Sequence, residues 1–544
     1  MALALLVASV VILICVCFSR ISGKIGIPFL LAFILLGMVF GSDGLFKIPF
    51  ANFALSEKIC SVALIFIMFY GGFGTRWSEA KPIAAKSIAL STVGVVATAG
   101  ITGLFCHFIL RMEWFESMLI GSVISSTDAA SVFSILRSKK LGLKNNTASL
   151  LEMESGSNDP CSYMLTAIII SAMNSSVDGV WGIIYLVFAQ FVYGIVIGVL
   201  IALGARFVLS NFKFTNEGFD TLFLVGIAVL SYALPSVISG NGYLSAYIVG
   251  IILGNSDIKN KQTMVHFFDG LTSLMQVLIF FLLGLLSFPS SLPTAFPKAI
   301  AIALFLTIIA RPVAVFAILT PLKCSIKQQL LVSWSGLRGA ASIVFAIMAS
   351  VNIDSLSCDI FHIVFCIVLI SITCQGTLLP FMAKRLDMID KNTNVLKTFN
   401  DYTEELDVQF IKLTISGDDH PWKNKKIREL SIPWDLLFVL VIRNGKRLIP
   451  NGKTILREND IVVVSAPVYQ GREAVQFEEK KVHSSSKWIG RKISDYANEK
   501  GMFVVLIKRG NNVVIPRGPT DIEENDILVT HTLDEEVQKT KALV

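Results

Sequence analysis

Two clusters of polar residues interrupt long apolar segments of this 544-residue sequence, and they contain the groups best suited to chemistry. The first cluster is SSTDAAS, residues 125–131, with Asp128, and the second is ESGSNDP, residues 154–160, with Asp159. A charge inside a membrane is costly, so it marks a candidate functional site. Burial disfavours the charged carboxylate, so such a group can bind either a proton or a dehydrated monovalent cation. One site with two exclusive occupants, reached from alternate sides, predicts exchange of one ion for the other.

Neutral oxygens lie beside both carboxylates in the sequence. They belong to Thr127, Ser155, Ser157 and the side chain of Asn158. Oxygen ligands of this kind suit sodium or potassium. Asp128 can also cap the second half of a broken helix, and the two roles are compatible.

Other charges in the apolar segments have a different interpretation. Glu154 needs a cationic partner, and the sequence offers Arg338, which lies between two glycines in SWSGLRGAAS, residues 333–342. A buried pair of this kind is expected to hold architecture rather than to carry ions. Arg311 has no partner that the sequence identifies, and Glu152 is interpreted as an interfacial or loop residue.

The composition requires a membrane. Hydrophobic residues make up 53% of the chain and charged residues only 16%, with a mean hydropathy of +0.67. Soluble domains contain about 25% charged residues, so we expect a polytopic α-helical membrane protein. Thirteen apolar segments are long enough, or nearly so, to cross the bilayer: residues 2–19, 25–41, 59–74, 84–109, 115–136, 150–173, 181–209, 220–236, 242–254, 265–287, 297–320, 328–349 and 360–383.

The loop charges support this number and give an orientation. With the N-terminus outside, only Lys47, Lys58, Arg111 and Lys298 fall in outer loops. The inner loops contain Arg20, Lys24, Arg76, Lys81, Lys86, Arg137, Lys139, Lys140, Lys144, Arg206, Lys213, Lys259, Lys261, Lys323 and Lys327. Lysine and arginine are enriched in cytoplasmic loops. We therefore predict a multi-pass protein of the inner (cytoplasmic) membrane whose C-terminal tail lies in the cytoplasm.

The order of the segments predicts inverted repeats. If the seventh segment links two halves of six, the halves begin on opposite sides of the membrane. The fifth and twelfth segments, both interrupted by polar residues, then occupy matching positions. Interrupted helices at matching positions of inverted repeats indicate a transporter's binding site. We expect the two broken helices to cross there.

The chain after about residue 390 has a different character. Residues 1–390 form the predicted membrane domain, 391–403 a linker, and 404–470 and 471–544 two similar modules. Residues 426–464 recur as 492–530 at an offset of 66, as the positions of Trp422 and Trp488 illustrate. Each copy reads as helix, strand, turn, short strand, turn and strand, which predicts a duplicated α+β module.

The motifs TDAAS and LEMESGSNDP resemble those of the monovalent cation/proton antiporters of the NhaP type, within the cation:proton antiporter superfamily, and especially their potassium/proton members. The resemblance covers about residues 1–385. It implies a homodimer of thirteen-helix protomers that work by an elevator-like movement, with electroneutral exchange of one cation for one proton.

The same resemblance implies roles for individual residues. Asp159 would be the central cation- and proton-binding carboxylate, and Asn158 and Glu154 would pair with Arg338 to hold the crossing helices. Asp128, Thr127, Ser155 and Ser157 would complete the ion site. Many relatives have a carboxylate before the Gly-Gly of the third segment, where this chain has Tyr70, so its cation shell has one acidic group fewer.

The tail resembles the TrkA-C (RCK C-terminal) module in two copies. Such modules are similar to ones that dimerise and bind small ligands, including nucleotides and cyclic di-nucleotides. Lys425, Lys426, Arg443 and Arg447 are the basic residues that could meet phosphates. A solvated basic surface and a purely structural, dimerising tail are the alternatives.

The sequence therefore predicts an antiporter of K+, or of Na+, against H+, regulated by its tail and important for cation and pH homeostasis. An RCK-regulated cation channel is the alternative, but it would need a TVGYG-type pore loop and few spans. A ligand sensor with a vestigial membrane part is a third class. We expect no enzyme activity, no cofactor, no nucleic-acid partner and no metal other than the transported ion; membrane lipid is the expected surrounding.

Overall fold

A computed structural model describes most of the membrane domain and the sheets of the tail. The described residues are 9–14, 29–139, 141–174, 179–212, 217–258, 260–353, 356–390, 408–415, 422–430, 436–443, 446–467, 477–484, 486–495, 503–509, 512–514, 516 and 518–531. The chain divides into two compact units, Met1–Glu404 and Glu405–Val544, and each is described by itself.

The first unit is helical. After a helical turn at residues 9–14, its helices are α2 (Phe29–Phe40), α3 (Phe53–Gly74), α4 (Trp77–Ala80), α5 (Ala84–Ala89), η1 (Leu90–Gly94), α6 (Val95–Phe108), α7 (Trp114–Val123), α8 (Ala129–Ser138), α9 (Thr147–Met173), α10 (Gly179–Asn211), α11 (Glu217–Val237), α12 (Gly242–Gly254), α13 (Lys261–Leu286), η2 (Pro289–Ser291), α14 (Leu292–Phe305), η3 (Leu306–Ala310), α15 (Arg311–Leu319), α16 (Ile326–Trp334), α17 (Ala340–Asn352), α18 (Ile360–Ile370), η4 (Ser371–Gly376) and α19 (Thr377–Arg385). A two-stranded sheet joins β1 (Gly142–Leu143) to β2 (Ile389–Asp390).

Seven stretches of described helix are long and apolar enough to cross a membrane. They are Phe53–Gly74, Ala84–Phe108, Gly179–Asn211, Gly218–Val237, Lys261–Leu286, Pro289–Leu319 and Ile360–Arg385. At 27 residues, α9 is also long enough, about 40 Å, but it contains three acidic residues. Most described helices overlap the predicted segments, but several extend beyond them, as α3 does by beginning at Phe53, and α4 and η2 lie between segments. The number thirteen and the inverted repeats stay predictions, since only residues 9–14 of the first segment are described.

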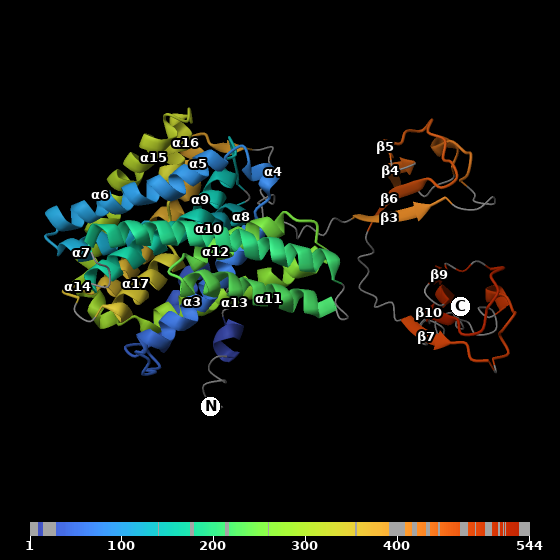
Figure 1. Cartoon of the computed structure of the whole chain (residues 1–544), viewed down its shortest axis with the longest axis horizontal. Helices are drawn as coiled ribbons and strands as arrows, with labels where there is room; N and C mark the ends of the chain where they lie inside the picture. Colours follow the sequence, from blue (N-terminus) through green and yellow to red (C-terminus); the bar gives the residue numbers. More distant parts are fainter. Residues whose placement is uncertain are drawn as a thin grey trace, which may run out of the picture. The chain divides into compact units, whose positions relative to one another are not determined.

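The helices of this unit form two packed groups. In one group α3 packs against α12 and α13, and α13 packs against α2. In the other group α6 packs against α7, α7 against α9, and α9 against α5. In Figure 1, α3, α11, α12 and α13 lie together on one side, whereas α5, α6 and α15 lie on the other, with α9 between them.

Glycines allow close packing within the first group. A Cβ added at Gly72 of α3 would lie 2.2 Å from the Tyr247 carbonyl oxygen of α12, and one at Gly250 would lie 2.2 Å from the Phe69 carbonyl oxygen. Such distances exclude any side chain. The FYGGFG sequence therefore holds α3 against α12, while Gly71 has open space beside it.

The tail contains two sheets of the same topology. The first has the order β3-β6-β4-β5 and the second the order β7-β10-β8-β9, with every pairing antiparallel. The strands are β3 (Val408–Thr414), β4 (Leu437–Arg443), β5 (Lys446–Leu448), β6 (Ile461–Pro467), β7 (Phe477–Lys481), β8 (Phe503–Arg509), β9 (Asn512–Val514) and β10 (Ile527–His531). The edge strands β3 and β7 were missing from the predicted unit. Each predicted unit began with a helix. Among the described residues, the first module has a 3-10 turn there, Ile427–Glu429, and the second has helical residues 493–495.

The repeat extends to one ion pair in each module, between a buried aspartate and a partly exposed arginine. Arg443 donates from Nε and Nη2 to the two carboxylate oxygens of Asp460, at 2.8 and 2.7 Å. Arg509 makes the same two bonds to Asp526, both at 2.9 Å, and each pair lies 66 residues from its counterpart. Arg443, which was predicted to meet a ligand phosphate, therefore uses Nε and Nη2 inside its own module, and phosphate binding by this residue stays a prediction.

The Arg443–Asp460 pair makes the first module sensitive to acid. Burial raises the pKa of Asp460, but the hydrogen bonds from Arg443 and from the Arg457 amide outweigh this effect and keep the pKa below its usual value of 3.8. Because the folded pKa is lower than the unfolded one, the stabilisation is complete above about pH 4 and is lost as pH falls through the folded pKa.

We predict that Asp460→Asn destabilises the first module by about 1.5–3 kcal/mol, since it weakens hydrogen bonds to a charged guanidinium. Hydrogen exchange of the strands in the full-length protein measures the effect, and Asp526→Asn is the matched variant in the second module. Asp460→Asn should increase exchange in β4 and β6 at pH 7. Unchanged exchange there would show that the pair contributes nothing to the module's stability.

Candidate functional site

Two interrupted helices cross in the middle of the first unit. The helix of the fifth segment stops at Val123 (α7) and resumes at Ala129 (α8), and that of the twelfth stops at Trp334 (α16) and resumes at Ala340 (α17). The backbone N–H of Asp128 donates to the carbonyl oxygen of Leu337 at 2.8 Å. The predicted crossing of the two broken helices is therefore present in the structure.

Arg338 satisfies backbone groups that the first interruption leaves without helical partners. Its guanidinium, 1% exposed, donates from Nη1 to the carbonyl oxygens of Ser125 and Ser126, at 2.9 and 2.7 Å. Unpaired backbone carbonyls at membrane depth are tolerated only where protein or a polar cavity satisfies them. Arg338 is therefore a tether between the two broken helices.

The glycines on either side of Arg338 make room for other charged side chains. A Cβ at Gly339 would lie 2.4 Å from the Cβ of Asp128, and one at Gly336 would lie 2.9 Å from Nε of Arg311. The sequence GLRG thus combines a cation with two positions where neighbouring side chains pass close to the backbone.

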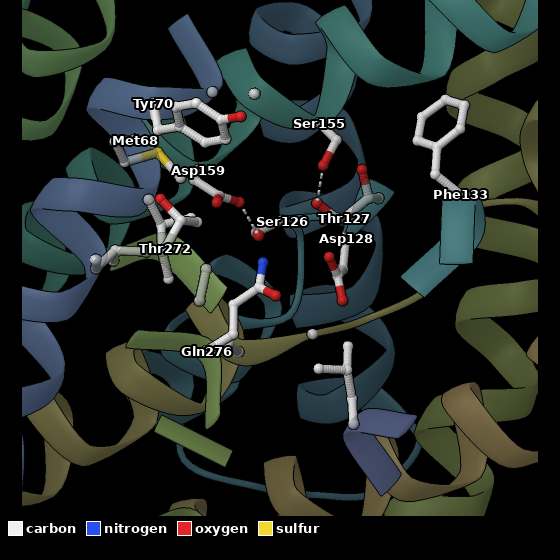
Figure 2. Close-up of a pocket in the computed structure, with 18 of the residues that line it drawn as sticks. Met68, Tyr70, Ser126, Thr127, Asp128, Phe133, Ser155, Asp159, Thr272 and Gln276 are labelled. Atoms are coloured by element: carbon white, nitrogen blue, oxygen red, sulfur yellow. Dashed lines mark hydrogen bonds between the residues drawn. The ribbon is translucent and has the colours of Figure 1, made fainter. Parts of the chain in front are cut away.

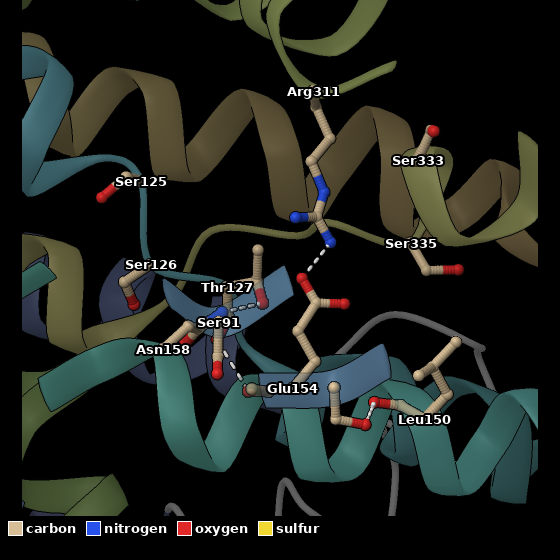
Figure 3. Close-up of polar contacts among 12 residues, drawn as sticks. Ser91, Ser125, Ser126, Thr127, Leu150, Glu154, Asn158, Arg311, Ser333 and Ser335 are labelled. Atoms are coloured by element: carbon tan, nitrogen blue, oxygen red, sulfur yellow. Dashed lines mark hydrogen bonds and ion pairs between the residues drawn. The ribbon is translucent and has the colours of Figure 1, made fainter. Parts of the chain in front are cut away.

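The predicted partner of Glu154 is wrong. The Glu154 carboxylate forms an ion pair with Arg311, not Arg338 (Figure 3), and both side chains are almost fully buried, at 1% and 3% exposed. Arg311 begins α15 directly after the π-helical turn η3, and Gly336 leaves space for its side chain. Arg311, which the sequence left without a partner, thus neutralises Glu154.

Asn158 also differs from its predicted role. Its side-chain Nδ2 donates to the Thr127 hydroxyl at 2.5 Å, so it joins α9 to the interruption without contacting Arg338. Ser155 adds a second bond between these segments, because its hydroxyl donates to the Thr127 carbonyl oxygen at 2.7 Å. Both residues fix the interruption of the fifth segment against α9.

The two predicted carboxylates lie along the same cavity (Figure 2). Asp159 is 7% exposed and accepts a hydrogen bond from the Ser126 hydroxyl. Asp128 accepts one from the Ser131 hydroxyl at 2.5 Å, one turn into α8. Asp128 therefore contacts the first turn of the second half-helix and also lines the cavity, and its roles as helix cap and ion ligand stay predictions.

The cavity has a volume of about 310 Å³. Of the predicted ion-site residues, Asp159, Asp128, Thr127 and Ser155 line it. Ser157 does not: its hydroxyl donates to the Met153 carbonyl oxygen at 2.7 Å and to the Tyr247 hydroxyl at 3.4 Å. The prediction that Ser157 contributes to this site is therefore wrong, because its position on α9 directs it toward α12.

Several cavity residues were missed by the sequence analysis. Glu152 lines the cavity, as do Ser126 and the α13 side chains Asp269, Thr272 and Gln276. The α13 residues are three to four positions apart, so they share one helix face. That polar stripe within an apolar segment was the signal that could have identified them. Tyr70 also lines the cavity, and its hydroxyl donates to Oδ1 of Asp269 at 3.2 Å.

The other basic tail residues predicted to bind phosphate have different surroundings. Lys425 is exposed, and Lys426 lies 3.6 Å from the carboxylate of Glu429. Arg447 lies in β5, and its side chain falls outside the described structure. Phosphate binding by Lys425, Lys426 and Arg447 stays a prediction.

Comparison with known families agrees with this architecture. Residues 7–385 match the family "Sodium/hydrogen exchanger, transmembrane". The chain belongs to the sodium/hydrogen exchanger family. Residues 417–473 and 477–544 match the TrkA-C domain, which confirms two such modules in this exchanger-family chain.

Relatives of this sodium/hydrogen exchanger family member include transporters of both potassium and sodium. It is 34% identical to the K(+)/H(+) antiporter NhaP of Alkalimonas amylolytica, over 85% of this chain and 81% of the relative. It is 29% identical to the K(+)/H(+) antiporter NhaP2 of Shewanella sp. strain ANA-3, over 84% and 80%. The solved sodium proton antiporter MjNhaP1 of Methanocaldococcus jannaschii has a similar fold, with a TM-score of 0.62 and 24% identity over 71% of this chain and 99% of that one.

We predict that Gly339→Ala disrupts the crossing, because its Cβ would overlap the Asp128 side chain. Overpacking of this kind costs about 1–3 kcal/mol, so the thermal unfolding temperature of the purified protein should fall. Gly226→Ala on α11, where nothing lies within 4 Å of an added Cβ, is the control. Equal unfolding temperatures for both variants would contradict the close contact.

The ion pair gives a second prediction. Glu154→Gln should cost about 3–5 kcal/mol of stability because it leaves Arg311 buried without its carboxylate. The double variant Glu154→Gln/Arg311→Met should recover much of this loss, whereas Glu154→Gln/Arg338→Met should not. Thermal unfolding of the three variants measures the coupling. If stability is recovered in Glu154→Gln/Arg338→Met instead, Glu154 pairs with Arg338 and the ion pair seen in the structure is contradicted.

Proposed function

We propose that this protein is a secondary active antiporter that exchanges K+ for H+, with Na+ as the other candidate cation. The observation that carries this proposal is the buried carboxylate of Asp159 at the wall of a polar cavity, beside two crossing interrupted helices. Membership of the sodium/hydrogen exchanger family supports cation/proton exchange. Relatives named as K(+)/H(+) antiporters at 34% and 29% identity favour potassium.

The exchange step uses one carboxylate for two ions. A protonated Asp159 releases H+ when a cation enters the cavity, and the carboxylate then binds the cation together with neighbouring oxygens. The carboxylate of Asp128 and the hydroxyl groups of Thr127, Ser126 and Ser155 supply those oxygens. Return of a proton to Asp159 displaces the cation on the other side of the membrane. Neither ion crosses without the other because the carboxylate cannot travel bare through a low-dielectric region.

A ratio of one cation to one proton follows from the proposal that both ions use the same carboxylate. Arg311 neutralises Glu154, and Asp159 holds either one proton or one monovalent cation. Asn158, the neutral residue beside Asp159, adds no further charge. Exchange is then electroneutral.

The packing of the helices supports an elevator-like movement. The cavity lies between α9 with the two crossings and the wall made by α3 and α13. Sliding of the first group against the second would expose Asp159 to alternate sides. We further propose that the protein is a homodimer in the cytoplasmic membrane, with the N-terminus outside and the tail inside, as the loop charges predict.

The tail is proposed to regulate transport. Two TrkA-C modules are present, and Lys425, Lys426, Arg443 and Arg447 are the candidates to bind a nucleotide or cyclic di-nucleotide. Arg443 also pairs with Asp460 in its own module.

Exchange in proteoliposomes tests the function. An imposed pH gradient should collapse on addition of K+ without a membrane potential, and more slowly with Na+, Li+ or Rb+. Asp159→Asn should abolish exchange, while Asp220→Asn, on α11 outside the cavity and bonded to Asn260, should retain it. Full exchange by Asp159→Asn would refute the antiporter mechanism, and cation flux that needs no proton countermovement would favour the channel.

A further inference from the structure

The wall of the cavity opposite the crossing contains its own set of oxygen atoms. Asp269, Thr272 and Gln276 lie on one face of α13, and Tyr70 joins them from α3. None of these residues comes from the two interrupted helices or from α9. In Figure 2, Thr272 lies on the side of the cavity near Asp159, and the side chain of Gln276 points toward Ser126.

Thr272 indicates that this wall accommodates a ligand. Its side chain is 7% exposed, and its hydroxyl oxygen has no hydrogen-bond partner among the described residues. Many helical hydroxyls of this unit bond to the carbonyl four residues earlier, as Thr166 does to Ser162 at 2.8 Å. A few others, such as Thr98 and Thr102, also have no partner within the described part of the chain, but they do not line this cavity. A buried hydroxyl without a partner costs about 1–3 kcal/mol, a cost that a bound cation or its water would remove.

The carboxylate of Asp269 supplies the charge. Unlike Asp159, Asp269 is exposed, so it lies where the cavity meets solvent. Tyr70 holds it through the hydrogen bond of 3.2 Å from its hydroxyl. Tyr70 occupies the position on the third segment at which the resemblance to NhaP-type antiporters would place a carboxylate. In this chain a carboxylate reaches the same wall from α13.

We propose that Asp269, Thr272 and Tyr70 form a second binding site for a partly hydrated monovalent alkali cation, which receives the ion before it passes to Asp159. A carboxylate, two hydroxyl oxygens and the nearby amide oxygen of Gln276 form an oxygen-rich set of the kind that alkali cations require. The single carboxylate matches a single positive charge. The inference rests on the proposed function, because it assigns the transported cation to this wall.

The position of the site determines when it acts. Asp269 and Tyr70 belong to the α3–α13 group, whereas Asp159 belongs to the group that carries the crossing helices. Movement of one group against the other separates the two sites. The second site therefore serves only the state in which Asp159 faces it, and it raises the affinity for the cation in that state without taking part in proton binding.

Transport kinetics provide the first test. Asp269→Asn and Thr272→Val should each raise the KM for K+ about fivefold or more in proteoliposomes, with the maximal rate within about twofold of the original. Thr272→Ser keeps the hydroxyl and should keep the KM, and Asp220→Asn is the carboxylate control. If the Tyr70–Asp269 bond is purely structural, Asp269→Asn will lower the unfolding temperature without changing the KM for K+. That result would overturn the proposal.

Direct binding of Rb+ to the full-length purified protein separates this inference from the proposed function. The Asp159→Asn variant should still bind about one Rb+ per chain, and Asp159→Asn/Asp269→Asn should bind none. Absence of Rb+ binding to Asp159→Asn, when that variant has lost exchange, would overturn the second site alone. Retained exchange in Asp159→Asn would instead overturn the proposed function.

Discussion

The architecture depends on satisfying a backbone that is interrupted inside an apolar bundle. Each helix break frees carbonyl and amide groups that lipid cannot hydrogen-bond. Arg338 meets this requirement by donating to the carbonyl oxygens of Ser125 and Ser126, and the amide of Asp128 pairs with Leu337 of the opposite break. The two breaks therefore stabilise each other. Without that mutual support, neither polar segment could remain extended beside the cavity, and Asp128 would lose its position.

The charges around the crossing divide into two roles. Glu154 and Arg311 neutralise each other in a fully buried pair, so they stabilise the arrangement without offering a site to a mobile ion. Asp159 receives a hydroxyl bond rather than a cation from the protein. A carboxylate left in this condition requires a proton or a metal ion from solution. Glu154 is thus neutralised by a cation of the protein, whereas Asp159 accepts only a hydroxyl bond from the described residues, and on this difference we base the proposal that Asp159 binds the ion.

The sequence predicted the parts of the fold that depend on local patterns. Apolar segments indicated the helices, and carboxylates in apolar surroundings indicated Asp128 and Asp159, since a charge there is costly and marks a candidate site. The partner of Glu154 was not predictable, because Arg311 and Arg338 lie on neighbouring segments and only packing determines which one reaches α9. The side-chain direction of Ser157 was not predictable for a related reason. Neighbouring positions on α9 face different elements, and Ser157 faces α12 rather than the cavity.

Register and helix faces account for the other errors. Ile442 pairs with Ile461 across β4 and β6, which places Arg443 beside Asp460, and the sequence alone showed only a basic residue. Asp269 was overlooked because it lies near the beginning of its predicted segment, residues 265–287. Thr272 and Gln276 continue the same face of α13. The 66-residue repeat was readable directly, since both modules conserve the arginine–aspartate pair as well as the turns.

The central claim is that Asp159 holds a proton or a cation, but never both. Proton release on cation binding tests it most directly. Weakly buffered purified protein is mixed with K+ while a pH indicator is read. The account predicts release of about one proton for each K+ that binds at Asp159, and no such release from Asp159→Asn. Cation binding by the unaltered protein without proton release would contradict it.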